Sequence, residues 1–177
     1  MKKVFLLVLC LCMMCTAAFA EDVIELNWEQ YGTEEAAAQG EFQQLEIPDV
    51  GTVLFWIPSV LNATDPGVVE GPFQPTALYV SEDDNYGVAI FLNEISGMNL
   101  EDYAKLMETE GGGANFRNVM INGIPCIGYE IEEDDMECLL YPVTDNVIAT
   151  FTCTPLNGDD DWDATKGVIF ASIQRGE

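Results

Sequence analysis

Acidic side chains dominate the residues of this sequence that could do chemistry. The densest group contains Asp159, Asp161 and Asp163 at alternate positions. Asn157, Asp159 and Asp161 place oxygen ligands at alternate positions, as the start of an EF-hand calcium loop does, but the sixth position of that loop is Trp162 rather than glycine and the twelfth is Val168 rather than glutamate. Two interpretations therefore remain. The three aspartates either form a calcium site of another type or cap and flank the start of a helix, and the second is favoured.

The sequence contains no histidine. This excludes Ser-His and Cys-His catalysis, zinc sites with histidine ligands, and the usual general base near neutral pH. Hydrolysis by paired carboxylates would need one acid with a raised pKa and a second acid about 5–9.5 Å away. No pattern marks such an acid among the 31 acidic residues. We therefore expect a protein that is not an enzyme and has no cofactor, with a carboxylate-dependent hydrolase as the weakest alternative.

Three cysteines, Cys126, Cys138 and Cys153, lie beyond the N-terminal segment. An odd number in a secreted protein leaves at least one thiol free or paired between chains. If Asp145-Asn146 is a two-residue turn, Cys138 lies opposite Cys153 on neighbouring antiparallel strands. This register allows a cross-strand disulfide, although the pair occupies a hydrogen-bonded site, the less favourable kind. The alternative is a pair of reduced thiols that fill the core.

The N-terminus has the features of a secretory signal peptide. The basic start Met1-Lys2-Lys3 precedes an apolar run over residues 4–15, and small residues end at Ala20. We predict cleavage after Ala20, which makes the mature protein secreted, or extracytoplasmic. The apolar run is too short to span a bilayer as a helix, which needs about 20 residues. Lipidation of Cys15 is a weaker alternative, because the preceding residue is Met14 rather than a small one.

Removal of residues 1–20 makes the chain still more acidic. Two of the six basic residues lie there, so four remain against 31 acidic ones. A charge of this sign repels nucleic acid and anionic membrane surfaces. It attracts cations, calcium above all, or a basic partner, although acidic surfaces also simply keep secreted proteins soluble. No later apolar stretch reaches about 18 residues, so we expect no membrane span in the mature chain.

The elements that position these residues follow from hydrophobic periodicity and turn signals. Apolar residues spaced as on one helical face predict a helix from Leu100, with its N-cap at Asn99 and its end at Gly111. A second helix is predicted over about Asp160 to Gln174. Asn122-Gly123 is the strongest hairpin signal. Strands are predicted at Glu41–Ile47, Thr52–Ile57, Thr76–Ser81, Gly87–Ile95, Phe116–Ile121, Ile124–Ile131, Met136–Val143 and Val147–Thr154.

The segment Asn62 to Pro75 is the longest predicted loop, and it is rich in proline and glycine. Val69 and Phe73 give it an apolar tip. Long ordered loops often carry recognition, so Phe73 and Val69 are our candidate contact residues for a partner. The alternative is that Phe73 folds back to cover the edge of the sheet.

Three segments carry a resemblance to a known family: Asn99–Met107 as a mid-chain helix, Val119–Cys126 as an Asn-Gly hairpin, and Ile169–Ile173 near the end of a terminal helix. The chain resembles the PsbP-like family, which includes PsbP, the Mog-type factors and small secreted bacterial proteins. The resemblance covers roughly Phe42 to Gln174. It implies an α+β fold, in which a largely antiparallel sheet is flanked by helices as an α/β/α sandwich.

The resemblance and the N-terminus together predict a signal peptide at 1–20, an extension at 21–41 and a single PsbP-like domain at 42–177. Proteins of this family share no catalytic motif, so no functional residue is carried over. The resemblance implies a non-catalytic binding or accessory domain, whose partner is an extracytoplasmic protein or a small ligand. The acidity and the lack of histidine separate this chain from its best-known relatives. A calcium-responsive acidic surface protein is the alternative function.

Overall fold

The computed structural model describes residues 23–69 and 74–176. Within these ranges the chain forms two β-sheets, four α-helices and one 3₁₀ turn, η1 (Pro66–Val68). The main sheet has the strand order β1 (Ile24–Leu26), β7 (Ala114–Ile121), β8 (Ile124–Ile131), β9 (Met136–Thr144), β10 (Val147–Thr154), β6 (Gly87–Glu94), β5 (Ala77–Ser81) and β4 (Leu61–Thr64). The smaller sheet has the order β11 (Gln174–Arg175), β3 (Gly51–Pro58) and β2 (Gly40–Ile47).

Tight turns make the main sheet almost entirely antiparallel. Asn122 and Gly123 join β7 to β8 with left-handed backbone angles, φ 48° and φ 81°, which is the conformation that an Asn-Gly turn favours. In the described part of the sheet, the pairing of β1 with β7 is parallel, and the other pairs are antiparallel. The predicted hairpin at Asn122-Gly123 is therefore confirmed.

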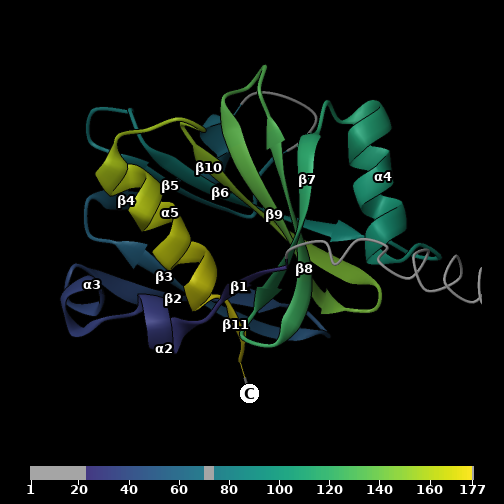
Figure 1. The fold of residues 1–177 in the computed structure, drawn as a ribbon, viewed down its shortest axis with the longest axis horizontal. Coiled ribbons are helices and arrows are strands. Elements are labelled where there is room, and N and C mark those ends of the chain that lie inside the picture. The colour runs from purple at the N-terminus through teal and green to yellow at the C-terminus, as the bar shows by residue number, and fades with distance from the viewer. Residues whose placement is uncertain (1–22, 70–73, 177) are drawn as a thin grey trace, which may run out of the picture.

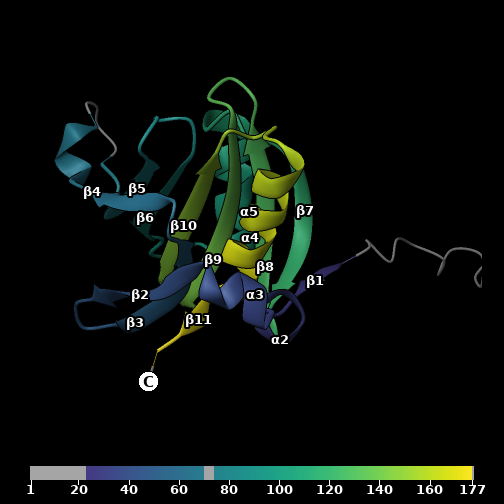
Figure 2. The ribbon, with the colours of Figure 1, turned by 90° about the vertical axis from the view of Figure 1, so that its left-hand side faces the viewer.

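Helices α4 (Leu100–Glu110) and α5 (Asp160–Ser172) cover opposite faces of the main sheet (Figures 1 and 2). Alternation along β9 shows this, because Cys138 and Leu140 pack with α4 whereas Leu139 and Tyr141 pack with α5. The predicted fold class, α+β with a largely antiparallel sheet between helices, is confirmed. None of the helices in the described ranges has the length and apolar character needed to cross a bilayer.

The segment predicted as an extension, 21–41, packs against the domain over the residues described. Strand β1 pairs with β7, and α2 (Trp28–Tyr31) packs against α5. A short helix, α3 (Glu34–Ala38), then leads into β2. The Trp28 ring lies 5.0 Å from the Phe42 ring and 6.4 Å from the Trp56 ring, measured between centroids. This part of the chain therefore contributes to the core.

Asn122 clamps three parts of the chain together beyond its role in the turn. Its side-chain oxygen accepts a hydrogen bond from the backbone N–H of Trp28 at 3.1 Å. Its amide nitrogen donates to the carbonyl oxygens of Ala171 and Ile173, each at 2.9 Å. Asn122, the first residue of the predicted Asn-Gly turn, therefore also holds α2 and the C-terminal end of α5 in place.

The structure corrects two predicted boundaries and places one hairpin in a separate sheet. Residues 62–64 of the predicted loop belong to β4, which pairs with β5. The last helix ends at Ser172, because Gln174 and Arg175 pair with β3. Strands β2 and β3 form a hairpin as expected, but they belong to the smaller sheet, which packs on the α5 side of the core.

Candidate functional site

The N-terminal turn of α5 is fixed by Asp159. Its Oδ1 atom accepts a hydrogen bond from the backbone N–H of Trp162 at 2.8 Å, which makes Asp159 the N-cap. Its Oδ2 atom accepts from the Tyr86 hydroxyl at 3.2 Å. This hydrogen bond and the negative charge of Asp159 raise the pKa of Tyr86 above its ordinary value. The cap therefore also positions an aromatic ring from the turn that precedes β6.

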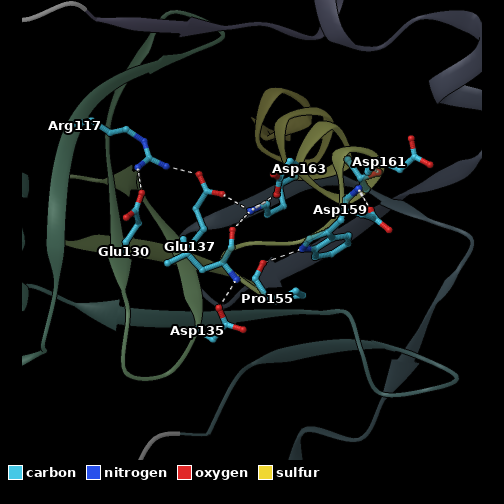
Figure 3. Close-up of polar contacts among 12 residues, drawn as sticks. Arg117, Glu130, Asp135, Glu137, Pro155, Asp159, Asp161 and Asp163 are labelled. Atoms are coloured by element: carbon cyan, nitrogen blue, oxygen red, sulfur yellow. Dashed lines mark hydrogen bonds and ion pairs between the residues drawn. The ribbon is translucent and has the colours of Figure 1, made fainter.

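A chain of ion pairs lies beside the same helix (Figure 3). Lys166 is buried, with 4% of its surface exposed, and its Nζ atom lies 2.9 Å from Glu137 Oε2 and 3.0 Å from Asp163 Oδ1. The same atom donates to the Leu156 carbonyl oxygen at 2.5 Å. All three ammonium protons therefore have acceptors, which is the condition under which a buried charge is tolerated.

Arg117 continues this chain across the sheet. Glu130 and Glu137 lie directly opposite each other on β8 and β9, an arrangement that repels unless a cation joins the two acids. Arg117 pairs with Glu137 through one nitrogen and with Glu130 through another, the latter at 3.0 Å. Gly128 faces Arg117, and a Cβ atom there would lie 3.1 Å from Arg117 Nε. The glycine thus leaves room for the arginine to cross.

We call Arg117, Glu130, Glu137, Asp163 and Lys166 the charged cluster. Burial alone would lower the pKa of Lys166, but the hydrogen bonds and charges of Glu137 and Asp163 outweigh it and hold the pKa above its usual value. The hydrogen bond from Lys166 holds the pKa of Asp163 below its usual value. Lys166 and Asp163 therefore each favour the charged form of the other.

Two hollows border the charged cluster. The outer one has a volume of about 530 Å³ and is lined mainly by acids of the β8–β9 turn, together with Leu156 and Asn157. The inner one has a volume of about 230 Å³ and lies between the sheet and α5, against Leu26, Leu139 and Phe170. Both hollows are bounded by residues of the cluster. The acids of the cluster pair with Arg117 or Lys166, whereas Glu132 and Asp135, which also line the outer hollow, form no ion pair among the described residues.

A larger groove, of about 830 Å³, lies on the other side of α5, between that helix, α3 and the end of β3. We call it the aromatic groove. Its aromatic and apolar lining comes from four separate elements or loops, and it includes Trp56, Val60, Tyr86, Trp162 and Val168. The Tyr86 and Trp162 rings pack with centroids 4.9 Å apart. Val60 is 64% exposed, so an apolar surface is open to solvent at this position.

The acids of the aromatic groove lack cationic partners. Glu35 on α3 and Asp159 and Asp161 on α5 border it, and all three are exposed. All four ion pairs among the described residues involve Arg117 or Lys166, and none reaches this groove. Figure 3 shows that Asp163 points toward the ion pairs whereas Asp161 points away from them. The groove therefore keeps its negative charge.

Trp56 is one of the residues that line the aromatic groove, and it carries an unsatisfied donor. Its surface is 3% exposed, and its indole Nε1 atom has no hydrogen-bond acceptor among the described residues. The edge of the ring that carries this nitrogen lies over Gly40, where an added Cβ would come within 2.5 Å of Trp56 Cε2. Buried N–H groups are nearly always paired, so this one marks a place where an acceptor is missing.

The three aspartates of the predicted calcium site do not form one ligand set. Asp159 caps α5 and holds Tyr86, Asp163 pairs with Lys166, and Asp161 borders the groove. The described residues contain no group of three or more Cys, Asp or Glu side chains that could hold a metal ion. The interpretation as a capping acid describes Asp159, and a calcium site at these aspartates stays a prediction.

The prediction that Cys138 and Cys153 lie opposite each other on neighbouring strands is wrong. A bulge between Val147 and Ile148 shifts the register of β9 and β10, so that Thr152 lies opposite Cys138. Cys138 packs on the α4 face and Cys153 on the α5 face, and both are buried free thiols. Burial raises the pKa of Cys138 to about 12 and raises that of Cys153 well above its usual value. Neither thiol is a nucleophile at neutral pH.

Of the two loop residues predicted to contact a partner, the structure describes Val69 only. Phe73 lies outside the described residues. Val69 follows the η1 turn as its C-cap and is half-buried, and it lies apart from the residues that line the aromatic groove. A role for either residue in partner binding stays a prediction.

Sequence reasoning singled out Asp159, Asp161 and Asp163 but missed the other residues that form the charged cluster and the aromatic groove. Lys166 and Glu137 are 29 positions apart in the printed sequence, and no local spacing links them. Trp56 and Tyr86 carried no signal beyond their aromatic character. One usable signal was the scarcity of cations, because Arg117 and Lys166 are two of only six basic residues.

The comparisons with known proteins concern the fold. No protein-family model matches this chain, and no curated protein matches it. One similar solved structure is the solution structure of cyanobacterial PsbP from Synechocystis sp. PCC 6803, with a TM-score of 0.49 and 12% sequence identity. The match covers 76% of this chain and 92% of that chain. A resemblance to PsbP was predicted from the sequence, and at this identity it is a likeness of fold alone.

Proposed function

We propose that this protein is a non-catalytic binding domain that works outside the cytoplasm and holds its partner in the aromatic groove. The observation that carries the proposal is the groove itself: a hollow of about 830 Å³ with an aromatic lining and acids that have no cationic partner. Binding sites are commonly concave and apolar, with a few polar groups that fix orientation.

The chemistry of the reactive groups supports a non-catalytic role. The sequence has no histidine, and burial raises the pKa of the described cysteine thiols. Lys166, the buried amine, is held charged by two acids. Asp163 has a lowered pKa, whereas the general acid of a glycoside hydrolase needs a raised one. The extracytoplasmic location rests on the leader pattern of residues 1–20, which lies outside the described residues.

Affinity capture tests the proposal when it is combined with a variant that blocks the groove. Mature chain 21–177 serves as bait for the envelope and culture fluid of the producing organism, against a bait of matched acidity. Ala164 is exposed and lines the groove, so Ala164→Trp fills it without disturbing the core. Ala37→Trp, at an exposed position of α3 outside the groove, is the matched control.

We expect a partner that the wild type and Ala37→Trp capture and that Ala164→Trp loses. A partner retained equally by all three baits contradicts the location of the site. If no partner exceeds the background of the acidic control bait, the proposed binding function itself is wrong.

A further inference from the structure

We infer that Asn157 is a site of spontaneous covalent modification, at which the folded protein loses a side-chain amide and gains an aspartyl or isoaspartyl residue. The sequence contains two Asn-Gly pairs, Asn122-Gly123 and Asn157-Gly158. A glycine after asparagine leaves the next backbone nitrogen unhindered, so these pairs are the asparagines most prone to this loss. The structure restrains the first pair and leaves the second open. The inference does not depend on the proposed binding function.

The reaction needs only the chain and water. The backbone nitrogen of Gly158 gives its proton to hydroxide from the solvent and attacks the Cγ atom of Asn157. A new C–N bond closes a cyclic succinimide, and the bond from Cγ to the side-chain nitrogen breaks. Ammonia leaves with a proton taken from water, which restores the hydroxide. Water then opens the succinimide at either carbonyl and gives an aspartyl residue or an isoaspartyl residue, whose backbone is longer by a methylene group.

The side chain of Asn122 is held away from this reaction. Its oxygen accepts a hydrogen bond from the backbone N–H of Trp28 at 3.1 Å. Its amide nitrogen donates to the carbonyl oxygens of Ala171 and Ile173, each at 2.9 Å. These hydrogen bonds fix both ends of the amide group. The side chain must give them up before Cγ can meet the next nitrogen, and each loss slows the reaction by up to about tenfold.

The side chain of Asn157 has no such restraint. It is exposed and makes no hydrogen bond among the described residues. The attacking N–H of Gly158 donates to no main-chain carbonyl in the described part of the chain, and its hydrogen bond goes to the carboxylate of Asp163. Among the described residues, the second pair therefore has a single hydrogen bond to break, against three at the Asn122 side chain.

The neighbours of the second pair are fixed, which defines what the modification would change. On one side, the Leu156 N–H donates to the Asp135 carbonyl oxygen at 2.8 Å. On the other side, Asp159 caps α5. Asn157 itself lines the outer hollow, most of whose lining residues are acids. Modification therefore adds a negative charge to that hollow, and the isoaspartyl product lengthens the chain between two anchored residues.

Peptide mapping by mass spectrometry tests this inference on the mature chain, 21–177, incubated in mildly alkaline buffer. Each Asn-Gly peptide is followed by the mass increase that accompanies the change from amide to acid. Labelling by an isoaspartyl methyltransferase identifies the isoaspartyl product. A sample unfolded in urea provides the comparison, because the fold no longer separates the two pairs there. Incubation continues until the unfolded sample is converted, so that a slow reaction is not mistaken for none.

A pair of variants assigns the acidic product to its position. Asn157→Gln should abolish it, because a glutamine side chain closes the corresponding ring far more slowly. Asn62→Gln is the matched control, since Asn62 is also exposed but is followed by an alanine. Ion-exchange chromatography separates the product by its added charge, and circular dichroism checks that each buffered sample stays folded.

In the folded protein we expect Asn157 to be converted at least about tenfold faster than Asn122. In urea the two rates should be similar. The acidic product should form in wild type and in Asn62→Gln. Equal rates at the two pairs in the folded protein, or conversion of Asn157 in urea alone, would overturn the inference. An acidic product that persists in Asn157→Gln would overturn it as well.

Discussion

The two sides of helix α5 use the same kinds of residues for opposite purposes. On one side, Asp163 and Lys166 join an ion-pair chain that runs through Glu137 to Arg117. On the other side, Asp159 and Asp161 border the aromatic groove, where no described cation pairs with them. Acids that are matched by cations hold the fold together, whereas acids left unmatched beside aromatic rings remain available to a partner.

Helical geometry produces this division. Residues two apart on an α-helix point to nearly opposite sides, so Asp161 and Asp163 cannot share one site. Residues three apart lie on one face, as the ion pair of Asp163 with Lys166 illustrates. The acids at the start of α5 therefore form two separate groups. Asp163 faces the charged cluster, whereas Asp159 and Asp161 face the aromatic groove.

Among the substitutions compared, replacement of Lys166 should lower the free energy of unfolding most. Lys166→Met leaves Glu137 and Asp163 without their shared cation, so the free energy of unfolding should fall by about 3 kcal/mol. Denaturant unfolding measures the change. Lys105→Met, at an exposed position of α4, is the control and should change stability by less than about 0.5 kcal/mol. A small effect of Lys166→Met would contradict a stabilising role for the charged cluster.

Ser172 joins α5 to Trp56 of β3. Removal of its hydroxyl should cause the next largest loss in the free energy of unfolding. Its buried hydroxyl accepts a hydrogen bond from the Trp56 backbone N–H at 2.8 Å and donates to the Ile169 carbonyl oxygen at 2.5 Å. Ser172→Ala leaves the Trp56 N–H unpaired and should cost about 2 kcal/mol. The midpoint of thermal unfolding should decrease. Ser96→Ala, at an exposed position outside the groove, is the matched control, and an equal loss there would remove Ser172 from this role.

Loss of the helix cap should lower the free energy of unfolding less than Lys166→Met or Ser172→Ala does. Asp159→Ala removes the acceptor for the Trp162 N–H and should lower the free energy of unfolding by about 1 kcal/mol. Asp159→Asn keeps an acceptor, so it should recover most of this loss while it removes the charge beside Tyr86. The pKa of Tyr86 should then move down toward its ordinary value, as followed by tyrosinate absorbance with Tyr86→Phe as reference. An unchanged tyrosine titration would exclude the contact with Asp159 in solution.

The smallest expected effect is a change in how stability depends on pH. It should differ between Asp163, which faces the charged cluster, and Asp161, which faces the groove. The folded protein holds the pKa of Asp163 below its unfolded value, so its stabilising contribution is present above about pH 4 and is lost as the pH falls further. The difference in unfolding free energy between wild type and Asp163→Asn should therefore shrink below about pH 4. Asp161→Asn serves as the matched change on the groove side. A pH dependence that is the same for both variants would argue against the pairing with Lys166.

Local patterns predicted the elements well. The spacing of Leu100, Tyr103, Ala104 and Met107 predicted a helix, and α4 begins at Leu100 with Asn99 as its N-cap. The Asn122-Gly123 pair predicted the β7–β8 hairpin. Such signals succeed because they act over a few residues, where backbone sterics and side-chain caps decide the conformation.

Register and burial were the points at which prediction failed. The two-residue turn between β9 and β10 was identified, yet the bulge after Val147 placed Cys138 and Cys153 on opposite faces. A shift of one residue in a strand exchanges the two faces completely. No feature of the sequence at Val147 indicated the bulge.

The sequence by itself determined the acidity, the absence of histidine, the helices with their caps and the hairpin turns, because each of these is a property of composition or of near neighbours. Tertiary structure alone decided which acids are neutralised and which are not. Lys166 reaches Glu137 only because α5 lies across the sheet, and Trp56 meets Trp162 at one groove only because β3 packs beside that helix. Electrostatic pairing depends on distance in space, and distance along the chain does not report it.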